Sequence, residues 1–277
     1  MDSKVDELLE SNFKPIVLVK TDEKPENAIG PKSNRGHGCV MSFIGKTIRD
    51  RVPSVFEKDT LSCFGAIVGL GFGNGYKESD MGLECFASFL STGLRDAEDK
   101  EKYQKFINLR PPQGRRMFEE GERVYHNYER AKEFMQNKVP CYENSKRYVV
   151  FKPLEDASEE ENVEAVIFTL NALELSVLLS FDTSLRDDLG YVMTPPSAAC
   201  QSIGNYVFNE AEKDDPHGIL GLIDLAGRNA MRPPLKTDYF TFAVPWKLFK
   251  KYEDNAEYSY LDGAVWDNMK ENLKKNE

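Results

Sequence analysis

The chain has 277 residues, 40% of them hydrophobic and 30% charged, which is an ordinary composition for a water-soluble globular protein. Its formal net charge of −10 repels phosphate backbones and argues against nucleic acid as a partner. No apolar run approaches the roughly 20 residues of a membrane helix, and the acidic N-terminus lacks the apolar segment of a signal peptide. We therefore expect a cytoplasmic protein without a membrane partner.

In chain order, the first half of the sequence predicts one strand and several helical segments. The strand spans 15–20, and the helices span 1–13, 40–51, 79–94 and 99–138. The last of these is strongly charged and is expected to be two helices broken at 111–114. A glycine-rich stretch at 62–75 departs from the spacing of a dinucleotide-binding loop, so turns and close packing are its expected use.

The stretch from 162 to 228 is the best place in the sequence to build a site. The apolar run 163–170 predicts a strand that ends at Asn171, and Asn171 with Glu174 has the spacing of a capping box for a following helix. A strand at 191–193, a helix near Cys200 and a strand at 218–224 then follow. Polar residues gather where these strands end.

The expected fold is α+β: one mixed central sheet flanked by helices. Its strands are expected at 15–20, 148–153, 163–170, 218–224 and 238–244. The segment 163–193 has the length of a right-handed βαβ unit. We expect a single domain over 1–277, with a charged tail at 268–277 that frays.

Three of the five cysteines share a local pattern. Cys39, Cys63 and Cys200 each lie beside small residues and close to a predicted helix start, where the helix dipole lowers a thiol pKa and favours the thiolate. If the three converge, they provide ligands for an iron–sulfur cluster or another soft metal. The alternative is that they are small, buried and unreactive. No Cys-x-x-Cys pair occurs, so free thiols are expected.

Three further residues are candidates for ligand contacts. His37 lies between two glycines next to Cys39, so it is either a ligand or general base, or simply an exposed loop residue. Asp224 and Arg228 are four residues apart, a spacing that permits an ion pair on one helical face. That pair either fixes the turn or leaves Arg228 to bind a carboxylate or phosphate.

Several short motifs, taken in order, resemble an uncharacterised family known as domain-of-unknown-function family 169, or ArCR. The motifs are Gly38-Cys39-Val40, Cys63-Phe64-Gly65-Ala66, Leu70-Gly71-Phe72, Val150-Phe151-Lys152-Pro153-Leu154, Ala199-Cys200-Gln201-Ser202-Ile203, Gly221-x-x-Asp224-x-x-x-Arg228 and Phe240-Thr241-Phe242-Ala243-Val244-Pro245. The resemblance covers about 15–266. It implies functional positions at Cys39, Cys63, Cys200, Asp224 and Arg228, but no activity. Gly227 and the charged insert 99–138 depart from the pattern.

The first functional hypothesis is therefore a small-ligand or cofactor-binding protein, with the cofactor unknown and a cysteine-ligated metal or iron–sulfur centre as its sharper form. The pocket is expected near the C-terminal ends of the central strands. The alternatives are an enzyme with Cys200 or Cys63 as a thiolate nucleophile, or an assembly protein without chemistry. A homo-oligomer is compatible with each of them.

Overall fold

A single seven-stranded sheet forms the centre of the computed structural model, which describes residues 1–33, 38–78, 81–110, 112–158, 160–187, 189, 192–196, 198–231, 235 and 238–276. Its strands are β1 (Phe13–Thr21), β2 (Ser54–Phe56), β3 (Tyr148–Pro153), β4 (Val163–Leu170), β5 (Val192–Met193), β6 (Gly218–Gly221) and β7 (Phe240–Pro245). They are ordered β2-β3-β1-β4-β7-β6-β5. Helices cover the sheet, so the predicted α+β class is confirmed.

Strand direction makes the sheet mixed. β4 pairs antiparallel with β1 and with β7, β7 pairs antiparallel with β6, and β6 pairs parallel with β5. The helices α9 (Ala199–Ser202) and α10 (Asn205–Ala211) connect β5 to β6, so these three parts form a βαβ unit. β4 and β5, which the sequence expected to be joined by a helix, also run parallel, with β7 and β6 between them.

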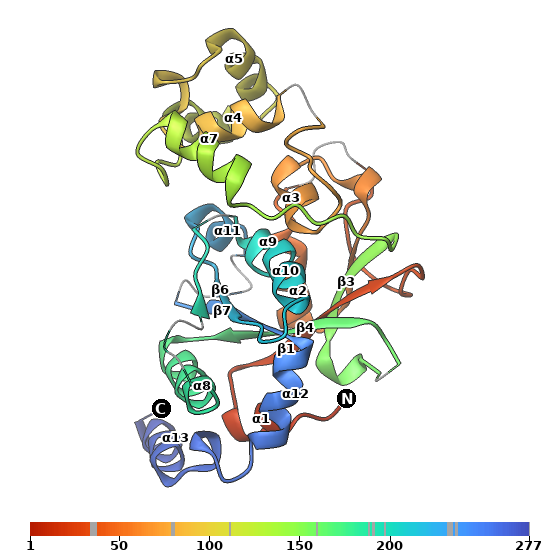
Figure 1. Cartoon of the computed structure of the whole chain (residues 1–277), viewed down its shortest axis with the longest axis vertical. Helices are drawn as coiled ribbons and strands as arrows, with labels where there is room; N and C mark the ends of the chain where they lie inside the picture. Colours follow the sequence, from red (N-terminus) through yellow and green to blue (C-terminus); the bar gives the residue numbers. More distant parts are fainter. Residues whose placement is uncertain are drawn as a thin grey trace.

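Alternation along β1 explains how both faces of the sheet become buried. Ile16 and Leu18 belong to the core cluster on one face, whereas Val17 and Val19 belong to the cluster on the other. The first face is covered by α2 (Met41–Asp50), α3 (Phe64–Gly69), α9, α10 and α11 (Leu225–Ala230). The second is covered by α1 (Lys4–Leu9), α8 (Ala172–Ser184), α12 (Trp246–Asn255) and α13 (Ala264–Asn276) (Figure 1).

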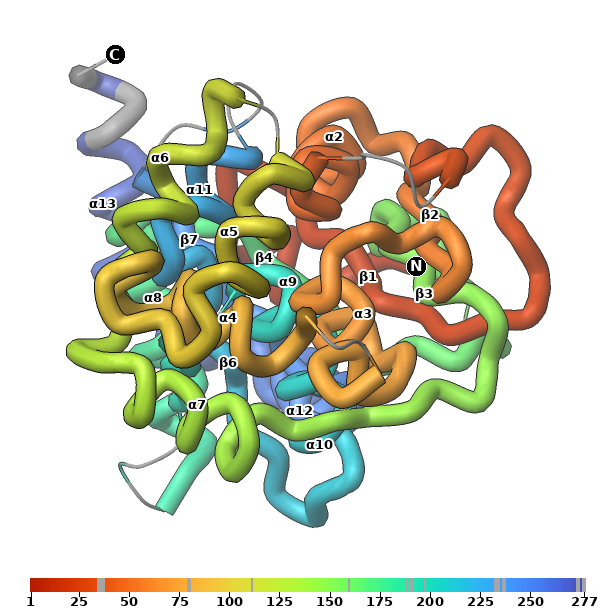
Figure 2. The backbone as a smooth tube through the Cα atoms, turned by 90° about the horizontal axis from the view of Figure 1, so that it is seen from above, coloured from red at the N-terminus to blue at the C-terminus, as the bar shows by residue number. Residues whose placement is uncertain are grey.

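A separate group of helices, which we call the helical cap, lies over the first face, beyond α9 and α11 (Figures 1 and 2). It consists of α4 (Gly82–Leu90), α5 (Lys100–Asn108), α6 (Pro112–Glu120) and α7 (Tyr128–Asn137), and it has its own aromatic core. The expected break at 111–114 is wrong in position, because Pro112 is the first residue of α6, where the missing N–H costs nothing. A second break follows Glu120, so segment 99–138 holds three helices.

The predicted capping box is confirmed at the start of α8. The Asn171 side chain accepts from the backbone N–H groups of Leu173 and Glu174, and a Glu174 oxygen accepts from the Asn171 N–H at 2.8 Å. The other Glu174 oxygen accepts from the Asn12 N–H at 2.9 Å. This one carboxylate therefore ties the start of α8 to the chain just before β1.

Other local expectations are met in part. Gly71 and Gly73 in the glycine-rich stretch have φ of 74° and 92°, which confirms the predicted turns. β2 lies outside the predicted strands, because three residues after Pro53 are too short for a clear periodic pattern. The N-terminal helix is shorter than expected, and α13 continues through most of the predicted frayed tail. None of the helices in the described part of the chain is long and apolar enough to cross a membrane.

Candidate functional site

A pocket separates the helical cap from the helices on the first face of the sheet. The space inside it that is open to the centre of a water molecule is ≈ 120 Å³, several times what one water needs. Its wall on the sheet side consists of residues at or near the starts of α2, α3, α9 and α11, and its opposite wall comes from the cap. The lining residues include Cys39, Val40, Cys63, Gly65, Ala66, Tyr76, Phe86, Phe89, Leu90, Glu122, Phe134, Met135, Val139, Pro196, Ala198, Ala199, Cys200, Gln201, Asp224, Ala226 and Gly227.

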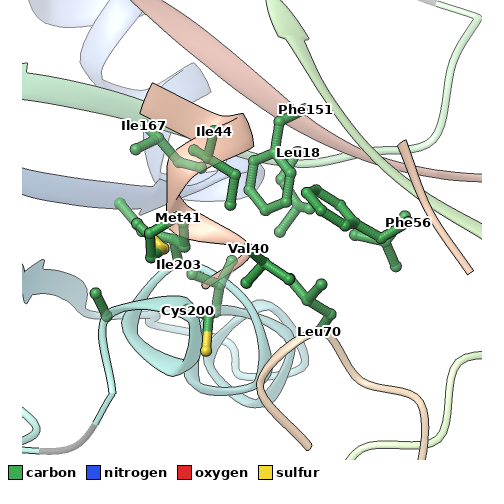
Figure 3. Close-up of a cluster of buried hydrophobic side chains, with 14 of the residues drawn as sticks. Leu18, Val40, Met41, Ile44, Phe56, Leu70, Phe151, Ile167, Cys200 and Ile203 are labelled. Atoms are coloured by element: carbon green, nitrogen blue, oxygen red, sulfur yellow. The ribbon is translucent and has the colours of Figure 1, made fainter. Parts of the chain in front are cut away.

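The three cysteines singled out in the sequence all line this pocket. Cys39 lies two residues before α2, Cys63 is the N-cap of α3, and Cys200 is in the first turn of α9, so their placement at helix starts is confirmed. The Cys200 thiol donates to the Gly65 carbonyl at 3.6 Å. Figure 3 shows Cys200 and Val40 at one end of the core cluster, with Phe151 and Ile167 at the other.

The expected lowering of the thiol pKa is wrong for two of these residues. Removal of water by the surrounding protein raises the pKa of Cys39 to about 12, although part of this side chain is exposed. Burial also raises the pKa of Cys200 well above its ordinary value, and the neighbouring Cys39 and Cys63 add to the shift. α9 has only four residues, so its dipole is too small to offset the loss of water.

The geometry gives no support to a shared metal. Among the described residues, no group of three or more His, Cys, Asp or Glu side chains is placed so that it could hold a metal ion. All five cysteines are free thiols. Cys85 is 1% exposed in the core of the cap, and Cys141 is exposed outside the pocket. His37 lies outside the described residues.

Asp224 and Arg228 have different roles. Asp224 is the N-cap of α11, and one of its carboxylate oxygens accepts from the Gly227 N–H. Its other oxygen, Oδ2, is buried and makes no hydrogen bond of ordinary geometry in the described structure, although the Ala199 N–H of α9 lies close enough to the carboxylate to lower its pKa. The Arg228 guanidinium donates to the carbonyls of Leu222 and Tyr239 and lies 4.8 Å from the centre of the Phe240 ring. Asp224 therefore contributes to the pocket, whereas these contacts of Arg228 fix the chain around α11.

The location of Asp224 and Cys200 follows from the topology. Asp224 comes after β6 and Cys200 comes after β5, and these two strands are parallel neighbours. The carboxyl ends of parallel strands meet at one edge of a sheet, where ligand sites of α/β proteins gather. The pocket therefore lies above the edge that the sequence indicated, but its second wall comes from the cap.

Glu122 is the functional candidate that the sequence did not reveal. It follows Gly121 in the loop between α6 and α7, and its N–H donates to the Phe89 carbonyl at 2.7 Å. Gly121 has φ of 72°, and a Cβ there would lie 2.3 Å from the Ser91 carbonyl oxygen, so glycine is required to bring the loop this close to α4. Within the charged run 119–123, nothing distinguishes Glu122 from its solvated neighbours.

The environment of Glu122 is unusual for a carboxyl group. Burial raises the pKa of Glu122 to about 7, and the nearby Asp224 carboxylate contributes to the shift. Burial likewise raises the pKa of Asp224, against the lowering effects of the Gly227 N–H of α11, the Ala199 N–H of α9 and Arg228. The two carboxyl groups come one from each wall, and the Asp224 charge adds to the proton affinity of Glu122, as expected for like charges that share a poorly solvated space.

Tyr76 and Gln201 form a second polar feature of the pocket that the sequence did not reveal. The Gln201 side-chain NH₂ donates to the Tyr76 hydroxyl at 2.9 Å, and its carbonyl oxygen is buried without a partner in the described part of the structure. Gln201 is 1% exposed. In the sequence, the position of Gln201 next to Cys200 was the one available signal that Gln201 belongs to the site.

The comparisons with known proteins identify a family but no activity. The family model described as DUF169, Uncharacterised ArCR, matches residues 4–255, a range that includes the segment 99–138. No curated protein and no solved structure matches the chain.

Proposed function

The chain belongs to the DUF169 family, described as uncharacterised ArCR, and from its pocket we propose that it binds a small organic ligand between the helical cap and the sheet. The observation that carries the proposal is the buried Gln201 Oε1, which has no hydrogen-bond partner among the described residues and lies with the Asp224 carboxylate on the wall of a mostly apolar cavity. A buried polar atom without a partner costs about 1–3 kcal/mol, which a bound ligand recovers.

Residues from both walls are proposed to contact the ligand. Cys39, Cys63 and Cys200 provide small polarisable thiols on the sheet side, together with Asp224. The ring of Phe86 and the side chain of Glu122 face them from the cap. A small molecule held in this way is the partner that a mostly apolar pocket with a few polar groups recognises.

We also propose that the chain is a single-domain cytoplasmic protein. Its charge of −10 disfavours nucleic-acid partners and suits a soluble ligand carrier. A homo-oligomer stays a prediction. The cysteine-ligated metal is retained only as an alternative that metal analysis distinguishes, because the described thiols do not form a coordinating group.

Filling the pocket should abolish ligand binding. Ala226 lines the pocket from α11, so Ala226→Leu places three extra carbons in the cavity. Asn229→Leu, at an exposed position of the same helix outside the lining residues, is the matched control. The measurement is saturation-transfer NMR with a library of single-ring fragments bearing amine, alcohol or acid head groups. We expect fragments to bind the wild type and the control but not Ala226→Leu.

Two outcomes would contradict the proposal. One is that no fragment binds the wild type, and the other is that Ala226→Leu binds the same fragments with the same affinity as the control. Metal analysis of the same preparation decides the alternative, since one equivalent of iron or zinc that is lost in Cys63→Ser would replace the organic ligand with a metal centre.

A further inference from the structure

The charged groups that line the pocket are of one sign. Glu122 and Asp224 carry carboxyl groups, and the described lining residues include no Lys, Arg or His. The nearest arginine along the chain, Arg228, donates to two backbone carbonyls and lies against Phe240. An anionic ligand would therefore meet two carboxylates in a poorly solvated space, which is strongly unfavourable.

The Asp224 carboxylate provides a buried hydrogen-bond acceptor in the pocket. Asp224 Oδ1 accepts from the N-terminus of α11, and Oδ2 is buried and makes no hydrogen bond of ordinary geometry in the described residues, although the Ala199 N–H of α9 lies close enough to the carboxylate to lower its pKa. A carboxylate oxygen can only accept a hydrogen bond, so the ligand must donate one. A charged donor satisfies it best, because hydrogen bonds between ions are shorter and stronger than neutral ones.

The second carboxyl group approaches from the opposite wall. The backbone that carries Glu122 is held to the end of α4 by bonds from the N–H groups of Glu122, Arg123 and Tyr125 to the carbonyls of residues 89–91, so the side chain is presented from a fixed loop. Glu122 and Asp224 line the same pocket, Glu122 from the cap and Asp224 from the start of α11, so their like charges share one cavity. A cation between them would relieve this repulsion.

The rest of the wall suits an apolar body. Phe86, Phe89, Phe134 and Tyr76 surround the cap side, and Met135 and Val139 continue the same surface. Such a wall offers burial of hydrocarbon surface and, where a ring face is open, attraction to a cation. A bare metal ion or a fully polar solute would leave this surface unused.

Resting on the ligand-binding function proposed above, we propose that the ligand is a small organic cation, namely an ammonium or amidinium group on a compact apolar body. The head group binds Glu122 and Asp224, and the body packs against the aromatic side chains of the cap. The pocket is thus assigned an organic cation and not a neutral or anionic ligand.

Three probes with the same body and different head groups test the assignment: benzylammonium, benzyl alcohol and benzoate. Calorimetric titration of the full chain at pH 8 should give benzylammonium an affinity at least about tenfold above that of the alcohol, since a charged hydrogen bond exceeds a neutral one by this order. Benzoate should not bind. Ala226→Leu should abolish the benzylammonium signal.

Charge-removing variants locate the head group. Asp224→Asn removes the charge and keeps a good N-cap residue for α11. Glu122→Gln removes the charge on the other wall. Each should weaken benzylammonium binding by about tenfold. Glu119→Gln, which removes an equal charge from an exposed position on α6, should leave the affinity unchanged.

The outcomes separate the two proposals. If benzyl alcohol or benzoate binds at least as tightly as benzylammonium, and Ala226→Leu removes that binding, the cation assignment is overturned while the ligand-binding function stands. If none of the three probes binds the wild type, both are contradicted. Equal loss of affinity in Glu119→Gln and Glu122→Gln would also overturn the assignment, because it would indicate a long-range charge effect.

Discussion

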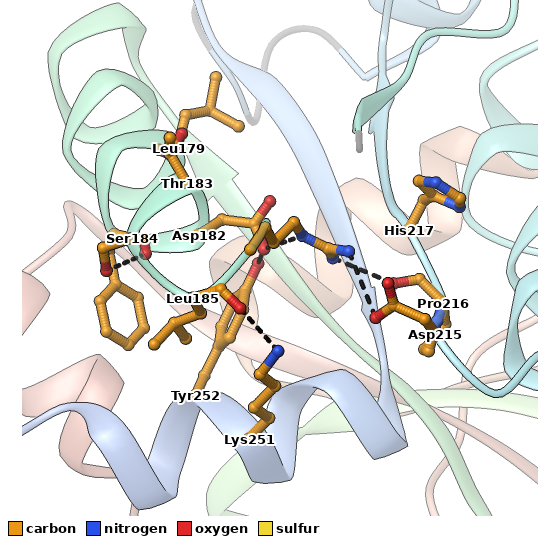
Figure 4. A network of polar contacts seen from close by, with 12 residues as sticks. Leu179, Asp182, Thr183, Ser184, Leu185, Asp215, Pro216, His217, Lys251 and Tyr252 are labelled. Carbon is orange, nitrogen blue, oxygen red and sulfur yellow. Dashed lines mark hydrogen bonds and ion pairs between the residues drawn. The ribbon is translucent and has the colours of Figure 1, made fainter. Parts of the chain in front are cut away.

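Replacing Asp182 with alanine should lower the free energy of unfolding by about 3–5 kcal/mol, because it leaves a buried guanidinium without its buried counter-charge. Asp182 on α8 accepts from Arg186 Nε at 3.0 Å and from the Tyr252 hydroxyl of α12 at 2.6 Å (Figure 4). The side chains of Asp182 and Arg186 are 0% and 3% exposed. Arg186 also donates to the Pro216 carbonyl, which joins α8 to the segment before β6.

Urea unfolding followed by circular dichroism measures this loss. Glu133→Ala is the control, since it breaks an exposed ion pair with Arg130, three residues away on the same helix, and should cost no more than about 0.5 kcal/mol. Equal losses in the two variants would contradict the prediction. Because α8 and α12 cover the face of the sheet opposite the pocket, the folded Asp182 variant should still bind ligand.

Replacing Phe106 with alanine should also cost about 3–5 kcal/mol, because it removes a large side chain from a packed aromatic core. Phe106 is 1% exposed at the centre of the cap. Its ring centre lies 5.9 Å from that of Phe86 and 5.7 Å from that of Phe118, and the Arg110 guanidinium lies 4.4 Å from it. Phe86 lines the pocket, so this variant should lose ligand affinity as well as stability.

The matched control is Met117→Ala, on α6 of the same cap. Met117 is 44% exposed, so its loss should change the free energy of unfolding by less than about 0.5 kcal/mol and leave ligand binding intact. The prediction fails if the two variants unfold at the same urea concentration, or if Phe106→Ala is destabilised but binds ligand as the wild type does.

Strong local patterns made much of the fold predictable. The run Val163–Leu170 is a buried strand because helices cover both faces of the sheet, and the Asn171 capping box is a local feature that needs no tertiary context. By contrast, β2 has three residues, and its place at the sheet edge depends on pairing with β3. Such pairing leaves no periodic signal in the sequence.

The candidate site was only half predictable, for a physical reason. Cys39, Cys63, Cys200 and Asp224 follow from their positions at strand ends and helix starts, which are local features. Glu122 becomes a pocket residue only because the cap folds over the sheet-side helices. The thiol error has a similar cause, since burial in the folded chain raises the pKa values of Cys39 and Cys200 and outweighs the effect of their positions at helix starts.

Binding of a cation by the Glu122 carboxylate should depend on pH. Burial raises the pKa of Glu122 to about 7, so in the free protein this group holds a proton at pH 6 and has lost it at pH 8. A bound cation favours the carboxylate and lowers this pKa, so affinity must rise with pH. Cys39, Cys200 and Tyr76, which also face the pocket, have raised pKa values and stay neutral in this range.

The measurement is therefore the affinity of the full chain for benzylammonium at pH 6 and pH 8. The dissociation constant should be about tenfold lower at pH 8, because the fraction of protein with ionised Glu122 rises by about that factor. In Glu122→Gln the two values should coincide. An affinity that is equal at the two pH values, or higher at pH 6, would contradict the account.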